Sequence, residues 1–109
     1  MKQELNLKIG GKDRLLKFGT NQTAIFCDKH NLSLVGYSDS LNTDNASASH
    51  LRDLIWSSLV AGAKYQKKEV DFDEYDVGDW IDDLSQSNLQ KIFDTMGGKE
   101  EGKKKPGGS

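Results

Sequence analysis

The sequence predicts an α+β fold that is mainly helical, with an N-terminal β-hairpin followed by about four helices. Residues 4–18 alternate between apolar and polar side chains around a Gly-Gly pair, which is typical of a hairpin. Residues 51–65 are apolar around most of a helical circumference, which indicates a buried central helix. Two later segments repeat the i, i+3, i+4, i+7 spacing of helices with one buried face.

The chain has 109 residues, which suffices for one modest hydrophobic core. We expect residues 1–97 to form a single small α+β domain. Residues 98–109 contain glycine, lysine and one proline but no apolar side chain to bury, so we expect a disordered, flexible tail.

In the hairpin, one face carries Leu5, Leu7 and Ile9 of the first strand. Leu16 and Phe18 of the second strand lie on the same face. The predicted register places Ile9 opposite Arg14, Leu7 opposite Leu16 and Leu5 opposite Phe18. A lone hairpin is marginally stable in water, so its apolar face must be covered by a helix or by a neighbouring subunit.

After the hairpin, Thr20 or Asn21 is suited to cap a helix that runs to about Lys29. A short apolar patch follows, formed by Leu32, Leu34 and Val35. Residues 36–45 are rich in Ser, Asp and Asn, whose side chains compete for backbone hydrogen bonds, so we predict a polar loop there.

The central helix begins at a Ser47 or Ser49 cap and ends near residues 67–68. Its narrow polar stripe consists of Asp53, Ser57 and Lys64. Ser58 and Gly62 lie four residues apart within the apolar arc, and their small size lets another backbone approach closely.

The acidic segment 69–83 contains a predicted helix. Asp71 or Asp73 caps its start, and it ends near Leu84. The apolar side of this helix consists of Val77, Trp80, Ile81 and Leu84. Ser85 or Ser87 then caps a last helix with Leu89, Ile92, Phe93 and Met96 on one side, and Gly97 and Gly98 end it.

No catalytic, metal or cofactor motif is apparent, and we predict that the protein is not an enzyme. The acidic run has Asp76 where a calcium loop starting at Asp71 needs glycine. His30 and His50 each lack a second ligand at helical spacing. The single cysteine, Cys27, forms no intramolecular disulfide and is expected to be a buried thiol.

Charge and hydropathy restrict the partners. A net charge near −2 argues against nucleic acid, which requires a clustered basic surface. The longest uncharged run, residues 54–63, is too short to span a membrane, and the N-terminus has no apolar signal region, so we expect a cytoplasmic protein.

The apolar hairpin face and several helical aromatic or branched residues are candidates for a partner or self-association surface. Trp56 lies near Val60 at one edge of the apolar arc, which makes it the better of the two tryptophans for such a contact. The full candidate set is Leu5, Leu7, Leu16, Phe18, Trp56, Val60, Trp80 and Phe93.

The order of these parts resembles the small tail assembly chaperones of long-tailed, siphovirus-type bacteriophages over residues 1–96. The resemblance rests on LKIGGKDRLLKFG, on a helix from NQTAIF to DKHNLSL, and above all on LRDLIWSSLVAG followed by an acidic helix ending in DVGDWID.

This resemblance implies a non-enzymatic protein of the host cytoplasm that coats the tape measure protein, recruits tail tube subunits and is absent from the mature virion. The family often makes a longer product by ribosomal frameshifting, and the lysine run 103–105 is compatible with a slippery site, so this chain would be the short form. Two alternatives remain open, namely a structural head-tail or tail component retained in the virion, and a small helical regulatory binding domain.

Overall fold

The computed structural model describes residues 3–40 and 47–96. In this part of the chain an antiparallel hairpin precedes five helices, which confirms the predicted α+β, mainly helical fold with one helix more than expected. The elements are β1 (Glu4–Ile9), β2 (Lys12–Lys17), α1 (Thr20–His30), α2 (Leu34–Ser40), α3 (Ala48–Tyr65), α4 (Glu74–Asp82) and α5 (Gln86–Met96). The predicted tail and the glycines expected to end the last helix lie outside the described residues.

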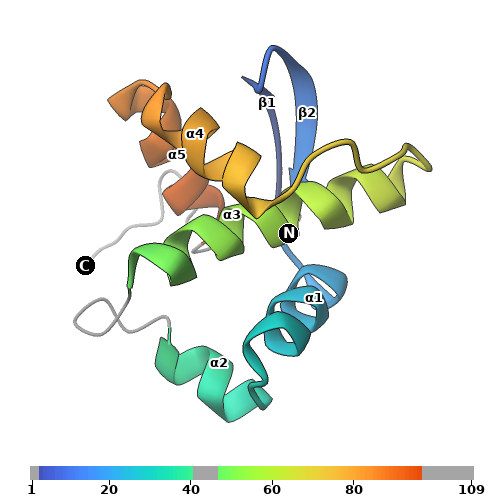
Figure 1. Ribbon diagram of the computed structural model, residues 1–109, viewed down its shortest axis with the longest axis vertical. Coiled ribbons are helices and arrows are strands. Elements are labelled where there is room, and N and C mark those ends of the chain that lie inside the picture. Colours follow the sequence, from blue (N-terminus) through green and yellow to red (C-terminus); the bar gives the residue numbers. More distant parts are fainter. Residues whose placement is uncertain (1–2, 41–46, 97–109) are drawn as a thin grey trace, which may run out of the picture.

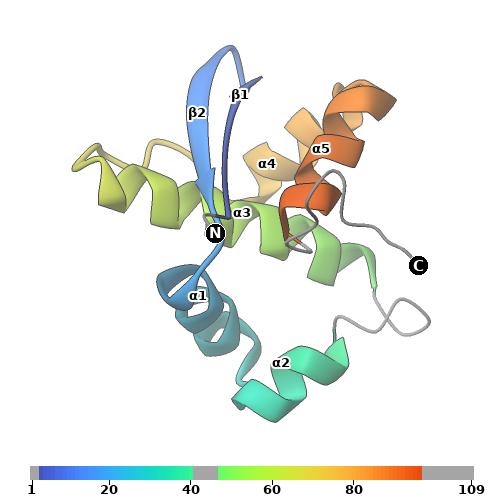
Figure 2. The same cartoon turned by 180° about the vertical axis from the view of Figure 1, so that it is seen from behind.

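Helix α3 crosses the middle of the molecule (Figure 1). The hairpin stands on one side of α3 together with α4 and α5, whereas α1 and α2 lie on the other side, as the reverse view also shows (Figure 2). Elements from both halves of the chain therefore surround the predicted central helix, and α3 is buried almost continuously from Asp53 to Gly62.

The hairpin register differs from the predicted one by two residues. Ile9 pairs with Lys12, and Leu5 pairs with Leu16. The connection is a two-residue turn in which Gly10 and Gly11 both have positive φ, the conformation that matches the twist of a tight hairpin. The apolar face is unchanged because a shift of two residues preserves the side-chain alternation.

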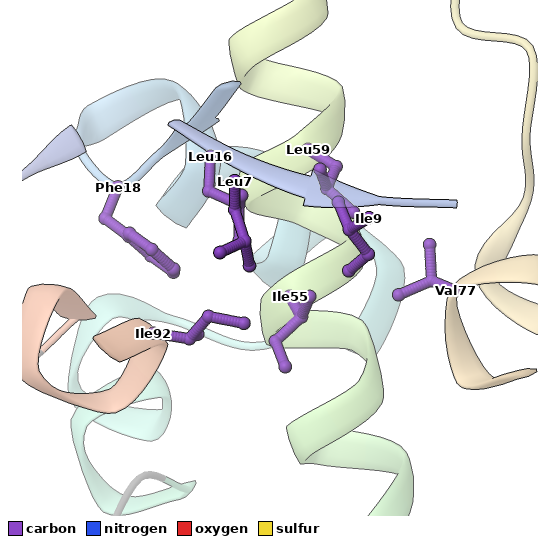
Figure 3. Packing of buried hydrophobic residues seen from close by; sticks show 8 residues of the cluster. All are labelled: Leu7, Ile9, Leu16, Phe18, Ile55, Leu59, Val77 and Ile92. Atoms are coloured by element: carbon purple, nitrogen blue, oxygen red, sulfur yellow. The ribbon is translucent and has the colours of Figure 1, made fainter. Parts of the chain in front are cut away.

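The main core forms where the hairpin meets α3, α4 and α5 (Figure 3). Leu7, Ile9, Leu16 and Phe18 come from the hairpin region, Ile55 and Leu59 from α3, Val77 from α4 and Ile92 from α5. Each fully buried side chain of this size contributes on the order of 2 kcal/mol. The helices of the same chain thus cover the apolar face of the hairpin.

The close backbone approach predicted at the small residues of α3 is confirmed at Gly62. A Cβ atom added there would overlap the carbonyl oxygen of Leu15 on β2. Ser58 is fully buried, and its hydroxyl donates to the carbonyl oxygen of Ile55. Strand β2 therefore crosses α3 at a distance that only glycine permits at this position.

Two predictions for the segment after the hairpin are wrong. Helix α1 begins after Gly19 without a side-chain cap, although it ends as expected, with Asn31 in the left-handed conformation. Residues 34–40, most of them assigned to a polar loop, form α2. The Ser33 hydroxyl accepts from the Gly36 amide, and the Tyr37 ring packs on Phe26, so a local cap and one aromatic contact support this helix.

The other helix starts agree with the sequence. Ser47 caps α3, Asp73 caps α4 in a capping box with Asp76, and the Ser85 hydroxyl accepts from the Asn88 amide at the start of α5. Helix α3 ends at Tyr65, slightly before the predicted residues 67–68.

Candidate protein-interaction surface

Half of the predicted partner surface lies inside the chain's own fold. Leu7, Leu16 and Phe18 belong to the main core, and Val60 is also buried. The three residues of the hairpin region are covered because α3, α4 and α5 occupy the hairpin face that the sequence left unassigned. Within the single chain, these four residues are each at most 8% exposed and offer little surface to a partner.

The other four predicted residues are half-buried and come from four different elements. Leu5, Trp56 and Trp80 pack against the main core from three different elements, and Phe93 lies on α5. The Lys29 ammonium lies 5.3 Å from the centre of the Trp56 ring, a cation–π contact between α1 and α3. Trp56 thus links two helices and keeps part of its surface exposed.

Trp80 has a structural role at the hairpin turn. Its ring lies so close to Gly10 that a Cβ added to that glycine would be 2.6 Å from ring atom Cδ2. The Arg14 guanidinium lies 4.4 Å from the centre of the Trp80 ring and 5.2 Å from that of Phe72. Trp80 therefore holds the tip of the hairpin against α4.

The most exposed large apolar and aromatic side chains were absent from the predicted set. Leu34 and Val35 on α2 are 71% and 72% exposed, and Tyr65 and Tyr75 are 61% and 68% exposed. The sequence places Leu34 and Val35 in a short apolar patch and gives them no partner role. The signal for their exposure was their position in a polar segment with few apolar partners.

A polar contact joins α1 to α3 along the stripe that the sequence predicted. The Asp53 carboxylate is 1% exposed and accepts from Arg52 Nε at 2.9 Å, and its other oxygen lies 2.8 Å from His30 Nε2. Gln22 Nε2 donates to the Ser57 hydroxyl at 3.1 Å. The stripe at Asp53 and Ser57 is therefore buried and hydrogen-bonded, because α1 supplies matching polar groups.

The described residues contain no group of three or more His, Cys, Asp or Glu side chains arranged to hold a metal ion. Cys27 is buried as expected, and its thiol lies 3.9 Å from the carbonyl oxygen of Ser33. His30 packs against Phe26 and His50 in a ring cluster between α1 and α3.

Ion pairs connect the start of α4 and the segment before it to the rest of the fold. Lys29 Nζ lies 2.8 Å from a Glu74 carboxylate oxygen, and this hydrogen bond lowers the pKa of Glu74 and raises that of Lys29. Hydrogen bonds from Arg14 and Lys12 lower the pKa of Asp71. Both contacts anchor the entry to α4.

A groove of about 430 Å³ lies between β2, the C-terminal half of α3 and the segment leading to α4. Its apolar lining includes Leu15, Leu59, Ala63 and Phe72, and its cationic lining is Lys12, Arg14 and Lys68. Asp13, Glu69, Asp71 and Gln66 complete it. This volume falls in the range of roughly 300–1,000 Å³ typical of binding clefts.

Comparison with models of protein families, with curated proteins and with solved structures finds no match to this chain. Among the described residues, no helix is both long enough and apolar enough to cross a membrane.

Proposed function

We propose that this protein is a tail assembly chaperone of a long-tailed phage, which coats the tape measure protein in the host cytoplasm and recruits tail tube subunits. In this proposal the chain is the short product of its reading frame, does no chemistry and leaves before the virion is complete. The sequence resemblance over residues 1–96 supports the assignment, as does the agreement of the hairpin and later helices with the expected order of elements.

The observation that carries the proposal is the exposed apolar pair on α2. Leu34 and Val35 are adjacent in the first turn of a helix that buries none of its residues, within a chain in which 29% of residues are charged. An apolar helix surface on a polar body suits a chaperone, because it binds the apolar stripe of a helical client while the complex stays in solution. Client contact is thereby assigned to α2 in place of the buried hairpin face.

The test uses co-expression with a long helical fragment of the tape measure protein encoded in the same genome. The wild-type chain should keep this fragment soluble and co-purify with it. Val35→Lys should weaken the complex about tenfold, because losing the burial of one valine costs about 1.5 kcal/mol. Asn21→Lys introduces the same charge at an exposed position on α1, away from the Leu34–Val35 pair, and should leave binding unchanged.

A fragment that is equally soluble without the chaperone would overturn the proposal, as would equal binding by the two lysine variants. Addition of tail tube protein to the complex should give a ternary complex. Mass spectrometry of purified virions should not detect the chain, whereas its presence in stoichiometric amount would favour the structural head-tail role.

A further inference from the structure

The charges of the described residues are sorted along the chain: residues 71–96 are acidic, and the described residues before them are basic. Residues 71–96 contain eight acids and one lysine, a formal charge of −7. The described residues before them, 3–40 and 47–70, contain nine lysines and arginines and six acids, a formal charge of +3. Such separation favours contacts between the acidic surface of one molecule and the basic surface of another.

At one end of the groove beside β2 lie two lysines without an ion-pair partner in the described part of the chain. Lys68 lines the groove, Lys67 precedes it, and both are exposed. Among the described residues neither lysine has a carboxylate within ion-pair distance. Asp13 and Glu69 also line the groove and have no ion-pair partner among the described residues, so the local excess of positive charge is that of Lys67 and Lys68 over Glu69 at one end. The groove floor adds buried leucines and the Phe72 ring, so this end suits an apolar occupant that also carries acidic groups.

Helix α4 presents a face with this chemistry. Tyr75, Asp79 and Asp82 are spaced i, i+4 and i+7, which places them on one side of the helix, opposite the buried Val77. Tyr75 is 68% exposed, and both aspartates are exposed. Neither aspartate has an ion-pair partner among the described residues.

We propose that the groove beside β2 of one copy binds the Tyr75–Asp79–Asp82 face of α4 in a second copy. Tyr75 packs on the apolar floor, and the two aspartates pair with Lys67 and Lys68. Aromatic anchors surrounded by complementary charge are typical of protein interfaces. Because the two surfaces differ, the contact is head-to-tail and leaves a free groove at one end and a free α4 at the other. The proposal is independent of the proposed function, since self-association needs no client.

The experiment is sedimentation velocity at low ionic strength over a range of protein concentrations. The wild-type chain should form a concentration-dependent series of oligomers that shifts towards monomer as salt is added, because salt screens exposed charges. Asp79→Lys/Asp82→Lys and, separately, Lys67→Glu/Lys68→Glu should each raise the dissociation constant at least about tenfold, since attraction becomes repulsion.

Mixing the two variants gives the decisive result. The first variant keeps the basic groove and the second keeps the acidic helix face, so the mixture should associate at a concentration at which each variant alone is monomeric. The double variant Asp28→Lys/Asp39→Lys makes the same charge change at exposed positions on α1 and α2, and it should associate like the wild type. Circular dichroism should give matching spectra for all variants.

Three results would overturn the proposal: a monomeric wild-type chain at every concentration in low salt, unchanged association of the reversed variants, or a mixture that stays monomeric. Because no client is present in these samples, the outcome does not depend on the chaperone assignment.

Discussion

The substitution Gly62→Ala tests the close crossing of β2 over α3, and Gly78→Ala provides its control. Both glycines are inside helices, where alanine is favoured by about 1 kcal/mol over glycine. At Gly62 the added methyl meets the backbone carbonyl of Leu15, so strand and helix must separate. At Gly78 the nearest atom is Arg52 Cδ at 3.4 Å, which belongs to a flexible side chain.

Overpacking a core costs about 1–3 kcal/mol, and the upper end applies where the obstacle is backbone. We therefore expect Gly62→Ala to lower the free energy of unfolding by about 2 kcal/mol after its helix-propensity gain, a fall of roughly 10 °C in Tm. Gly78→Ala should raise stability by up to about 1 kcal/mol. Urea denaturation followed by circular dichroism measures both. If Gly62→Ala is as stable as Gly78→Ala, the crossing distance is wrong.

Further predictions concern the turn, the buried carboxylate and one ion pair. Gly10→Ala should lose more stability than Gly11→Ala in thermal melts, because both have positive φ but only Gly10 faces the Trp80 ring, whereas Gly11 has nothing within 4 Å. Asp53→Asn should lower the free energy of unfolding by about 2–3 kcal/mol, as measured by urea denaturation. This is less than the cost of breaking a fully buried ion pair, because solvent reaches His30 and Arg52. Glu74 has a lowered pKa in the folded state, so its stabilisation is present above its ordinary value of 4.5 and is lost as the pH falls through the lowered pKa. Glu74→Gln should therefore be less stable than wild type by about 0.2–1 kcal/mol at neutral pH, and the difference should shrink in acid.

The sequence was sufficient to predict the elements whose signals lie within the segment itself. Alternation predicted the hairpin, and helical spacing with Ser or Asp caps predicted α3, α4 and α5. The register was missed because pairings that differ by two residues bury the same side chains. The positive φ of both glycines places a two-residue turn at Gly10 and Gly11, and the Gly-Gly pair was the available signal for it.

What the sequence missed depends on contacts between distant segments. The sequence predicted a narrow polar stripe at Asp53 and Ser57 but no partner for it, because the sequence of α3 does not show that Gln22 and His30 lie opposite. Trp80 seemed available to a partner, although Gly10 and Arg14 enclose its ring. The acidic segment was visible in the sequence, but the groove was not, since β2 and the end of α3 are far apart along the chain.

The position of α3 between the two halves of the molecule has a consequence for synthesis on the ribosome. The hairpin emerges first, but its apolar side chains find α3 only after about residue 65 has left the exit tunnel, and α5 later still. Nascent chains shorter than this expose the apolar side chains of the hairpin to solvent and are prone to aggregate. Truncations that end within α3 should therefore accumulate in inclusion bodies, whereas removal of residues 98–109 should leave the yield of soluble protein unchanged.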